Sequence, residues 1–110
     1  MRAIFLFLAP FLVAAAPATV PPMAITSHAV TAADYPAESI PLQEQGTTRV
    51  AYTVGTDGIT ADLRIAQSSG SVRLDEAALA IVGRWRYAPA KQAGRPVVWH
   101  DFANVAFVLN

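Results

Sequence analysis

Hydrophobic and polar residues alternate along two neighbouring segments of the chain, residues 48–55 and residues 59–67. A period of two is typical of a half-buried β-strand, because successive side chains point to opposite faces. Asp57-Gly58 lies between the segments and favours a tight hairpin turn, since glycine tolerates a positive φ. The pattern predicts an antiparallel hairpin. The apolar residues expected to point inward are Val50, Tyr52, Val54, Ile59, Ala61, Leu63 and Ile65.

Residues 74–87 follow a helical period instead. The charges suit a helix dipole, with acidic Asp75 near the start and basic Arg84 and Arg86 near the end of the segment. Pro89 then stops the helix. The predicted apolar stripe consists of Leu74, Ala77, Ala78, Ile81, Val82 and Trp85.

Two further elements complete the expected fold. Asp34 can cap a short helix with Pro36 in its first turn, and Pro41 ends that helix. Residues 97–109 follow a glycine-containing loop, residues 91–96, and read as a third strand with its final apolar residues alternating inward. The order helix, strand, strand, helix, strand predicts an α+β domain. Its three-stranded antiparallel sheet would carry the main helix and the short N-terminal helix on one face.

The first 18 residues have the layout of a secretory signal peptide. Arg2 precedes an uncharged, mostly apolar segment, and Ala16-Pro17-Ala18 offers small residues for cleavage after Ala18. The alternative is an uncleaved anchor in the inner membrane. Residues 3–16 would rise only about 21 Å as a helix, against a hydrocarbon core of ~30 Å. Export of a cleaved chain is therefore the preferred interpretation.

The rest of the chain divides into two parts. Residues 19–33 contain adjacent prolines and no regular period, which predicts a flexible lead. Residues 34–110 form the single expected domain. We refer to residues 19–33 as the lead throughout.

Composition excludes several classes of function. The chain has 8 basic and 8 acidic residues, a balance that argues against nucleic acid as a partner. It has no cysteine, and so neither a disulfide nor a thiolate zinc site. No glycine-rich phosphate loop or dinucleotide fingerprint occurs. We expect no cofactor, no metal and no small-molecule substrate.

A hydrolase is the enzymatic alternative, with Ser68 or Ser69 as the nucleophile beside His100 and Asp101. The serines lack the G-x-S-x-G elbow, and nothing in the sequence brings the groups together. His100 and Asp101 are adjacent in a strand and would point to opposite faces, which also argues against a shared metal. The preferred interpretation is a polar loop and an exposed histidine, and no enzyme.

The final segment, residues 97–109, is long and apolar for a small sheet. A strand at a sheet edge exposes unpaired main-chain N–H and C=O groups. Such an edge can take up an extended peptide, with main-chain hydrogen bonds supplying affinity and alternate side chains supplying specificity. It can also pair with a second copy, which makes a homodimer a further expectation.

An ordered set of short motifs resembles the TonB C-terminal domain family. The resemblance covers residues 34–110, and the run from Ser68-Ser69-Gly70 to Pro89-Ala90 is its most specific part. The motifs are Tyr35-Pro36, Gly46, Asp57-Gly58, Ser68-Ser69-Gly70, Leu74-Asp75, Ala77-Ala78-Leu79, Trp85-Arg86-Tyr87, Pro89-Ala90, Gly94 and Val105-x-Phe107-x-Leu109.

This resemblance implies a periplasmic protein-binding module of Gram-negative bacteria, linked to TonB-dependent transmembrane transport. Its edge strand would take up the Ton box of an outer-membrane receptor, or a segment of another envelope protein. By position, two sets of residues would make the contact. The edge strand would contribute Phe102, Ala103, Asn104, Val105, Ala106 and Phe107, and a second contact would come from Asp34, Tyr35 and Pro36.

The sequence departs from the family's energy transducer in the segment before the domain. The transducer has an N-terminal transmembrane helix and a long proline-rich linker, whereas here a signal peptide is predicted and the lead reaches only ~50 Å at full stretch. Asp34 also stands where some members have glutamine. The predicted function is a free periplasmic binding module. A membrane-anchored energy transducer is the alternative.

Overall fold

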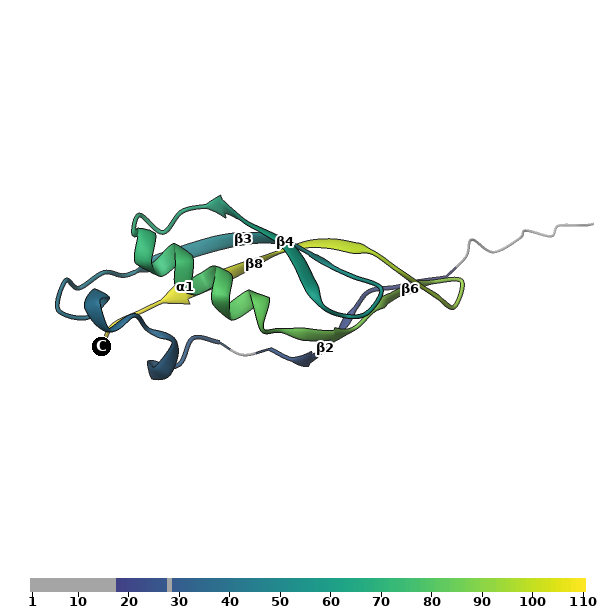
Figure 1. The fold of residues 1–110 in the computed structure, drawn as a ribbon, viewed down its shortest axis with the longest axis horizontal. Coiled ribbons are helices and arrows are strands. Elements are labelled where there is room, and N and C mark those ends of the chain that lie inside the picture. The colour runs from purple at the N-terminus through teal and green to yellow at the C-terminus, as the bar shows by residue number, and fades with distance from the viewer. Residues whose placement is uncertain (1–17, 28) are drawn as a thin grey trace, which may run out of the picture.

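The computed structural model describes residues 18–27 and 29–110 and shows an α+β chain (Figure 1). The elements in chain order are β1 (Thr19–Val20), β2 (Met23–Thr26), the 3-10 turns η1 (Ala32–Asp34) and η2 (Ala37–Ser39), β3 (Gly46–Val54), β4 (Thr60–Gln67), α1 (Val72–Gly83), β5 (Arg86–Ala88), β6 (Ala90–Gln92), β7 (Arg95–Val97) and β8 (Trp99–Phe107).

The main sheet has the strand order β4-β3-β8, and both pairings are antiparallel. The predicted hairpin is confirmed as β3 and β4. β8 pairs with β3 without interruption, from Gly46 opposite Phe107 to Val54 opposite Trp99. β3 is therefore central, and β4 and β8 form the two edges of this sheet.

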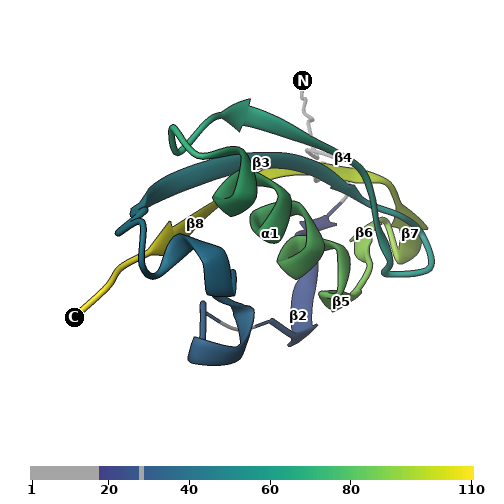
Figure 2. The same ribbon diagram turned by 60° about the vertical axis from the view of Figure 1, so that its left-hand side comes forward.

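Helix α1 packs against one face of the sheet, and the lead and the 3-10 turns lie on that same side (Figure 2). The inward positions predicted on β3 and at the end of β8 are confirmed as buried. Burying one such aliphatic or aromatic side chain contributes about 1.5–3 kcal/mol to the free energy of folding, so these buried residues form the main stabilising cluster. The cluster consists of Val50, Tyr52, Val54, Leu74, Ala78, Ile81, Val82, Val105 and Phe107.

A β-bulge changes which β4 side chains point inward. The prediction was wrong for Ile59, which is 43% exposed, and for Ala61, which is also exposed. Thr60 takes the inward place instead and donates its hydroxyl to a main-chain oxygen of α1 at 2.9 Å. Asp62 then adopts a φ of 51°, and the register shifts. The extra residue reverses the alternation, so Leu63 and Ile65 return to partly buried positions.

The main helix is shorter at its end than the sequence predicts. α1 begins at Val72, where the Ser71 hydroxyl caps it by accepting the N–H of Leu74 at 3.3 Å. It ends at Gly83, and of the residues predicted as its last turn Arg86 and Tyr87 lie in β5, which pairs with β2. Strand pairing overrides the helical period here, because aromatic residues such as Tyr87 suit strands as well.

The segment before β3 also differs from the prediction. The expected short α-helix is replaced by η1 and η2, and Asp34 ends η1 where it was expected to cap a helix. Tyr35 and Pro36 are extended, with ψ of 125° and 129°. A residue before proline is driven out of the helical region, and this separates the two turns.

The lead contains two short strands where no regular element was predicted. β1 pairs with β6, and β2 pairs with β5. The predicted loop at residues 91–96 is mostly a hairpin, in which β6 and β7 join through Ala93 and Gly94. Both turn residues have positive φ, 51° and 79°, as a two-residue turn of type I′ requires.

The predicted signal peptide lies outside the described residues except for Ala18, as does His28, so export stays a prediction. Within residues 18–27 and 29–110, no helix is long and apolar enough to span a membrane.

Candidate functional site

The outer edge of β8 has no strand beside it in the described part of the chain. The N–H and C=O groups of successive residues point to opposite sides of a strand, so one known hydrogen bond gives the direction of these groups along the whole strand. The N–H of Gly55 donates to the Ile59 oxygen at 2.9 Å, which places odd-numbered β3 residues toward β4 and even-numbered ones toward β8. In the β3–β8 register, odd-numbered β8 residues then bond to β3 and even-numbered ones face the open edge.

A side-chain contact agrees with this assignment. The N–H of Phe102 donates to the carboxylate of its neighbour Asp101 at 2.8 Å. This N–H is therefore turned away from β3, in agreement with the assignment of even-numbered β8 residues to the open edge. Asp101 caps one of the edge groups, and such local capping is a way to protect an exposed edge.

The six β8 residues predicted to bind a peptide fall into two groups. Phe102, Asn104 and Ala106 present main-chain groups to the open edge, with their side chains on the sheet face away from α1. The other three, Ala103, Val105 and Phe107, bond to β3 through the main chain and turn their side chains toward the core. Only the first group has main-chain groups at the open edge, and within it the Phe102 N–H already donates to Asp101.

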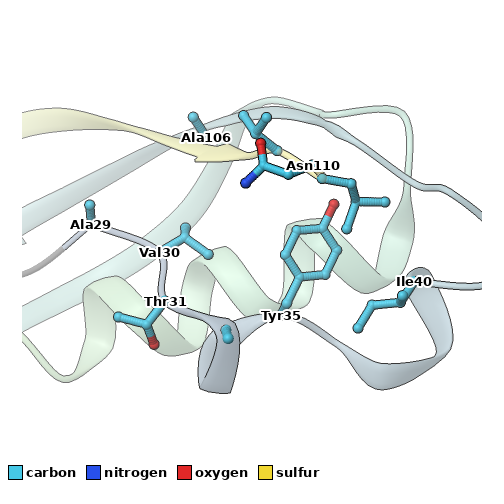
Figure 3. A pocket seen from close by; sticks show the side chains of 10 residues that line it. Ala29, Val30, Thr31, Tyr35, Ile40, Ala106 and Asn110 are labelled. Atoms are coloured by element: carbon cyan, nitrogen blue, oxygen red, sulfur yellow. The ribbon is translucent and has the colours of Figure 1, made fainter.

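Two shallow grooves run beside this edge. The first, of about 450 Å³, lies between lead residues 29–32 and the C-terminal residues 106 and 108–110 (Figure 3). The second, of about 420 Å³, lies between residues 27 and 29–30 of the lead and residues 104–106 of β8, with Trp85 also lining it. Open main-chain groups thus stand next to mostly apolar space.

The predicted second contact is only partly at this site. Tyr35 lines the first groove, packs edge-on against Phe107 with ring centroids 5.5 Å apart, and donates its hydroxyl to the Glu44 oxygen. Burial, with the nearby Glu44 carboxylate, raises the pKa of Tyr35. Asp34 accepts from both the N–H and the hydroxyl of Thr31 at 2.9 Å. Asp34 is thus used inside the domain, and Pro36 does not line either groove.

An aromatic cluster lies where α1 gives way to β5. Tyr52 packs edge-on against Trp85 and stacks on Tyr87, and the two tyrosine hydroxyls are 3.1 Å apart. Burial, and then the hydrogen bond between the two hydroxyls, raise the pKa of Tyr52. The Trp85 indole Nε1 is buried and has no hydrogen-bond partner among the described residues. A buried donor without an acceptor is uncommon in a native fold.

The serine loop has a structural role around Asp75. This carboxylate accepts from the Thr48 hydroxyl at 2.7 Å, from the Ser69 N–H at 2.9 Å and hydroxyl at 2.8 Å, and from the Ser68 hydroxyl. Burial acts to raise the pKa of Asp75, but these hydrogen bonds outweigh it and lower the pKa to about 2. The Ser-Ser-Gly and Leu-Asp motifs thus join the β4–α1 loop to β3.

The serines and His100 do not meet. His100 lies opposite Thr53 at one end of β3, whereas Gln67, just before the serine loop, lies opposite Arg49. Four residues of strand separate these positions, about 13 Å. The nucleophile–base contact that a hydrolase needs is not formed.

Residues that sequence reasoning missed come mainly from the lead. Ala29 and Val30 line both grooves, yet nothing periodic surrounds them in the sequence. On the other face of the sheet, the Arg49 guanidinium lies 4.4 Å from the centre of the Phe102 ring. Only the register of β8 on β3 reveals that pair.

Comparison with known families addresses the same region. A model of the family described as "Gram-negative bacterial TonB protein C-terminal" matches residues 31–109, nearly the whole described domain. The chain belongs to this family. The resemblance drawn from the motifs is thereby confirmed. No curated protein matched the chain.

Membership in the TonB C-terminal family carries general conclusions. These domains are non-catalytic, interact with outer-membrane receptors and are linked to TonB-dependent transport. The family also connects the chain with the Gram-negative cell envelope.

Proposed function

We propose that this TonB C-terminal domain binds an extended segment of an outer-membrane receptor, its Ton box, by adding that segment as a strand beside β8. The observation that carries the proposal is the open main-chain edge of β8 at Asn104 and Ala106, bordered by two apolar grooves. Main-chain hydrogen bonds would give affinity, and the grooves would receive alternate side chains.

The position of the added strand follows from the edge. The Phe102 N–H is already satisfied by Asp101, so a partner gains least there. Beyond it, the even-numbered residues of β8 that face the open edge are Asn104 and Ala106. We therefore centre the contact on Ala106.

Proline at position 106 tests the mechanism. Ala106→Pro removes an N–H that points to the open edge and takes no part in pairing with β3, so the fold should persist. Ala106→Ser keeps the N–H and is the matched control. We expect Ala106→Pro to weaken binding of a synthetic Ton-box peptide about five- to tenfold by calorimetry, since a main-chain hydrogen bond contributes about 1–1.5 kcal/mol. Ala106→Ser should bind within about twofold of the parent chain.

Circular dichroism and thermal melting of both variants show whether the sheet is intact. Full binding by a folded Ala106→Pro chain would refute strand addition at β8. Loss of binding in both variants would instead assign the contact to the side-chain surface at this position.

We propose further that residues 1–18 are removed and that the module acts free in the periplasm. The signal-peptide pattern of the sequence supports this. Mass spectrometry of the chain purified from its host decides it. A mature chain that starts near Thr19 supports the proposal, and a chain that retains its first residues supports an anchored transducer.

A further inference from the structure

The two grooves meet at one point beside β8. Both are lined by Ala29, Val30 and Ala106, which Figure 3 shows in the first groove, so the lead and the edge strand border both grooves at the position where a partner strand would cross from one groove to the other. Val30 is partly buried and packs against the hydrophobic core. A strand that continues through both grooves must pass Val30.

We propose that the lead is an intramolecular competitor for the β8 edge, and that an incoming segment displaces Val30 and puts an apolar side chain of its own in that place. This inference rests on the proposed function and deepens it. It names a required feature of the ligand, an apolar residue that lies beside Ala106.

The lead is held weakly enough to be displaced. Its longest strand, β2, has four residues, all exposed, and its register is irregular between Ala24 and Thr26. Its large apolar side chains gain little from the present position, because Met23 is 71% exposed and Ile25 is 67% exposed. Short, exposed pairings of this kind open most easily in a native protein.

A fixed point lies directly after Val30. Thr31 is held through its N–H and hydroxyl by Asp34, and the Asp34 carboxylate also pairs with Arg84 at 3.0 Å. The side-chain surface of Asp34 is only 9% exposed. The part of the lead that ends at Val30 can therefore move away while Thr31, η1 and the rest of the domain stay in place.

The present arrangement also leaves hydrogen bonds unmade. No main-chain hydrogen bond joins residues 29–32 to β8 in the described structure. An added strand brings main-chain carbonyl and N–H groups to this edge. The lead borders the edge across the two grooves and makes no main-chain hydrogen bond to it, so no such bond has to break when the lead is displaced.

Thiol labelling of the full mature chain tests the displacement. The parent chain has no cysteine, so Val30→Cys carries a unique thiol in a partly buried place, and Ile25→Cys is the control in an exposed place. We expect a saturating Ton-box peptide to raise the labelling rate at position 30 about fivefold or more, and to leave position 25 within twofold.

Affinity gives a second measurement. Val30→Ser removes the apolar contact that holds the lead, so we expect five- to tenfold tighter peptide binding, whereas Ile25→Ser should stay within twofold. A labelling rate at position 30 that falls on peptide binding would make the lead a second wall of the site and overturn the inference. An unchanged rate with normal peptide binding would also overturn it, and leave strand addition standing. No binding by any variant would overturn both proposals.

Discussion

Asp75 shows how a short motif can be structural although its residue types suggest chemistry. One carboxylate gathers hydrogen bonds from two serines and a threonine and thereby ties a loop, a helix and a strand together. A serine-rich loop next to an aspartate is also what a hydrolase would offer. Only the geometry distinguishes a structural loop from a hydrolase site. The serine hydroxyls donate to Asp75, and His100 is at the other end of the sheet.

We expect Asp75→Asn to lower the free energy of unfolding by about 2 kcal/mol near neutral pH, since bonds to a charged acceptor are the stronger kind. Urea denaturation measures it, with Glu76→Gln, an exposed change on the same helix, as the control. A loss equal to that of the control would contradict the structural role of Asp75.

The same carboxylate predicts a dependence on pH. Its pKa is lowered from 3.8 to about 2, so its stabilisation is complete above about pH 4 and is lost as the pH falls toward 2. The parent chain should lose more stability between pH 4 and pH 2 than Asp75→Asn does. Parallel curves for the two chains over this range would refute the assignment.

Gly58 makes a second prediction for a single residue. It has a φ of 81°, and a Cβ built there would lie 1.9 Å from the Tyr87 oxygen. We expect Gly58→Ala to cost about 3 kcal/mol, through a strained backbone and a forced displacement of β5. Gly94→Ala is the control, because its φ of 79° is similar but nothing lies within 4 Å of the added Cβ. Thermal melting should show a loss of only about 1 kcal/mol there, and equal losses would exclude the contact with Tyr87.

At the scale of elements, the sequence predicted what depends on local periodicity. The hairpin of β3 and β4 and the body of α1 follow from alternation and from the helical stripe. The end of α1 could not be predicted, because Trp85 continues the helical stripe and the β2 partner of the next residues lies far away in sequence. The bulge at Asp62 was equally hidden, since it appears only when β4 is laid against β3.

The candidate site was predictable only in part. The sequence indicated the last strand and its possible use as an edge. Whether its odd-numbered or its even-numbered residues turn their main-chain groups to the open edge depends on its register with β3. Val30 and the neighbouring lead residues could not be found, because short irregular segments carry no pattern and their place is set by packing against the core. Tertiary contacts, more than local propensity, decide those positions.

At the scale of the whole molecule, the open edge also bears on self-association. Two copies that meet through β8 would use the same main-chain groups as a bound peptide. We expect any dimer at high concentration to dissociate on addition of a Ton-box peptide, and Ala106→Pro to be monomeric. Sedimentation at several concentrations measures both, and a dimer that persists in Ala106→Pro would place the interface elsewhere.

The two edges of the main sheet differ in a way that limits assembly. β8 is regular, whereas β4 carries register irregularities at two places and a residue with positive φ. A bent edge is a poor template for another strand. In the terms of polymer chemistry, the main sheet is monofunctional: two copies that pair through β8 use the regular edge of each, and their irregular β4 edges do not extend the sheet into a filament.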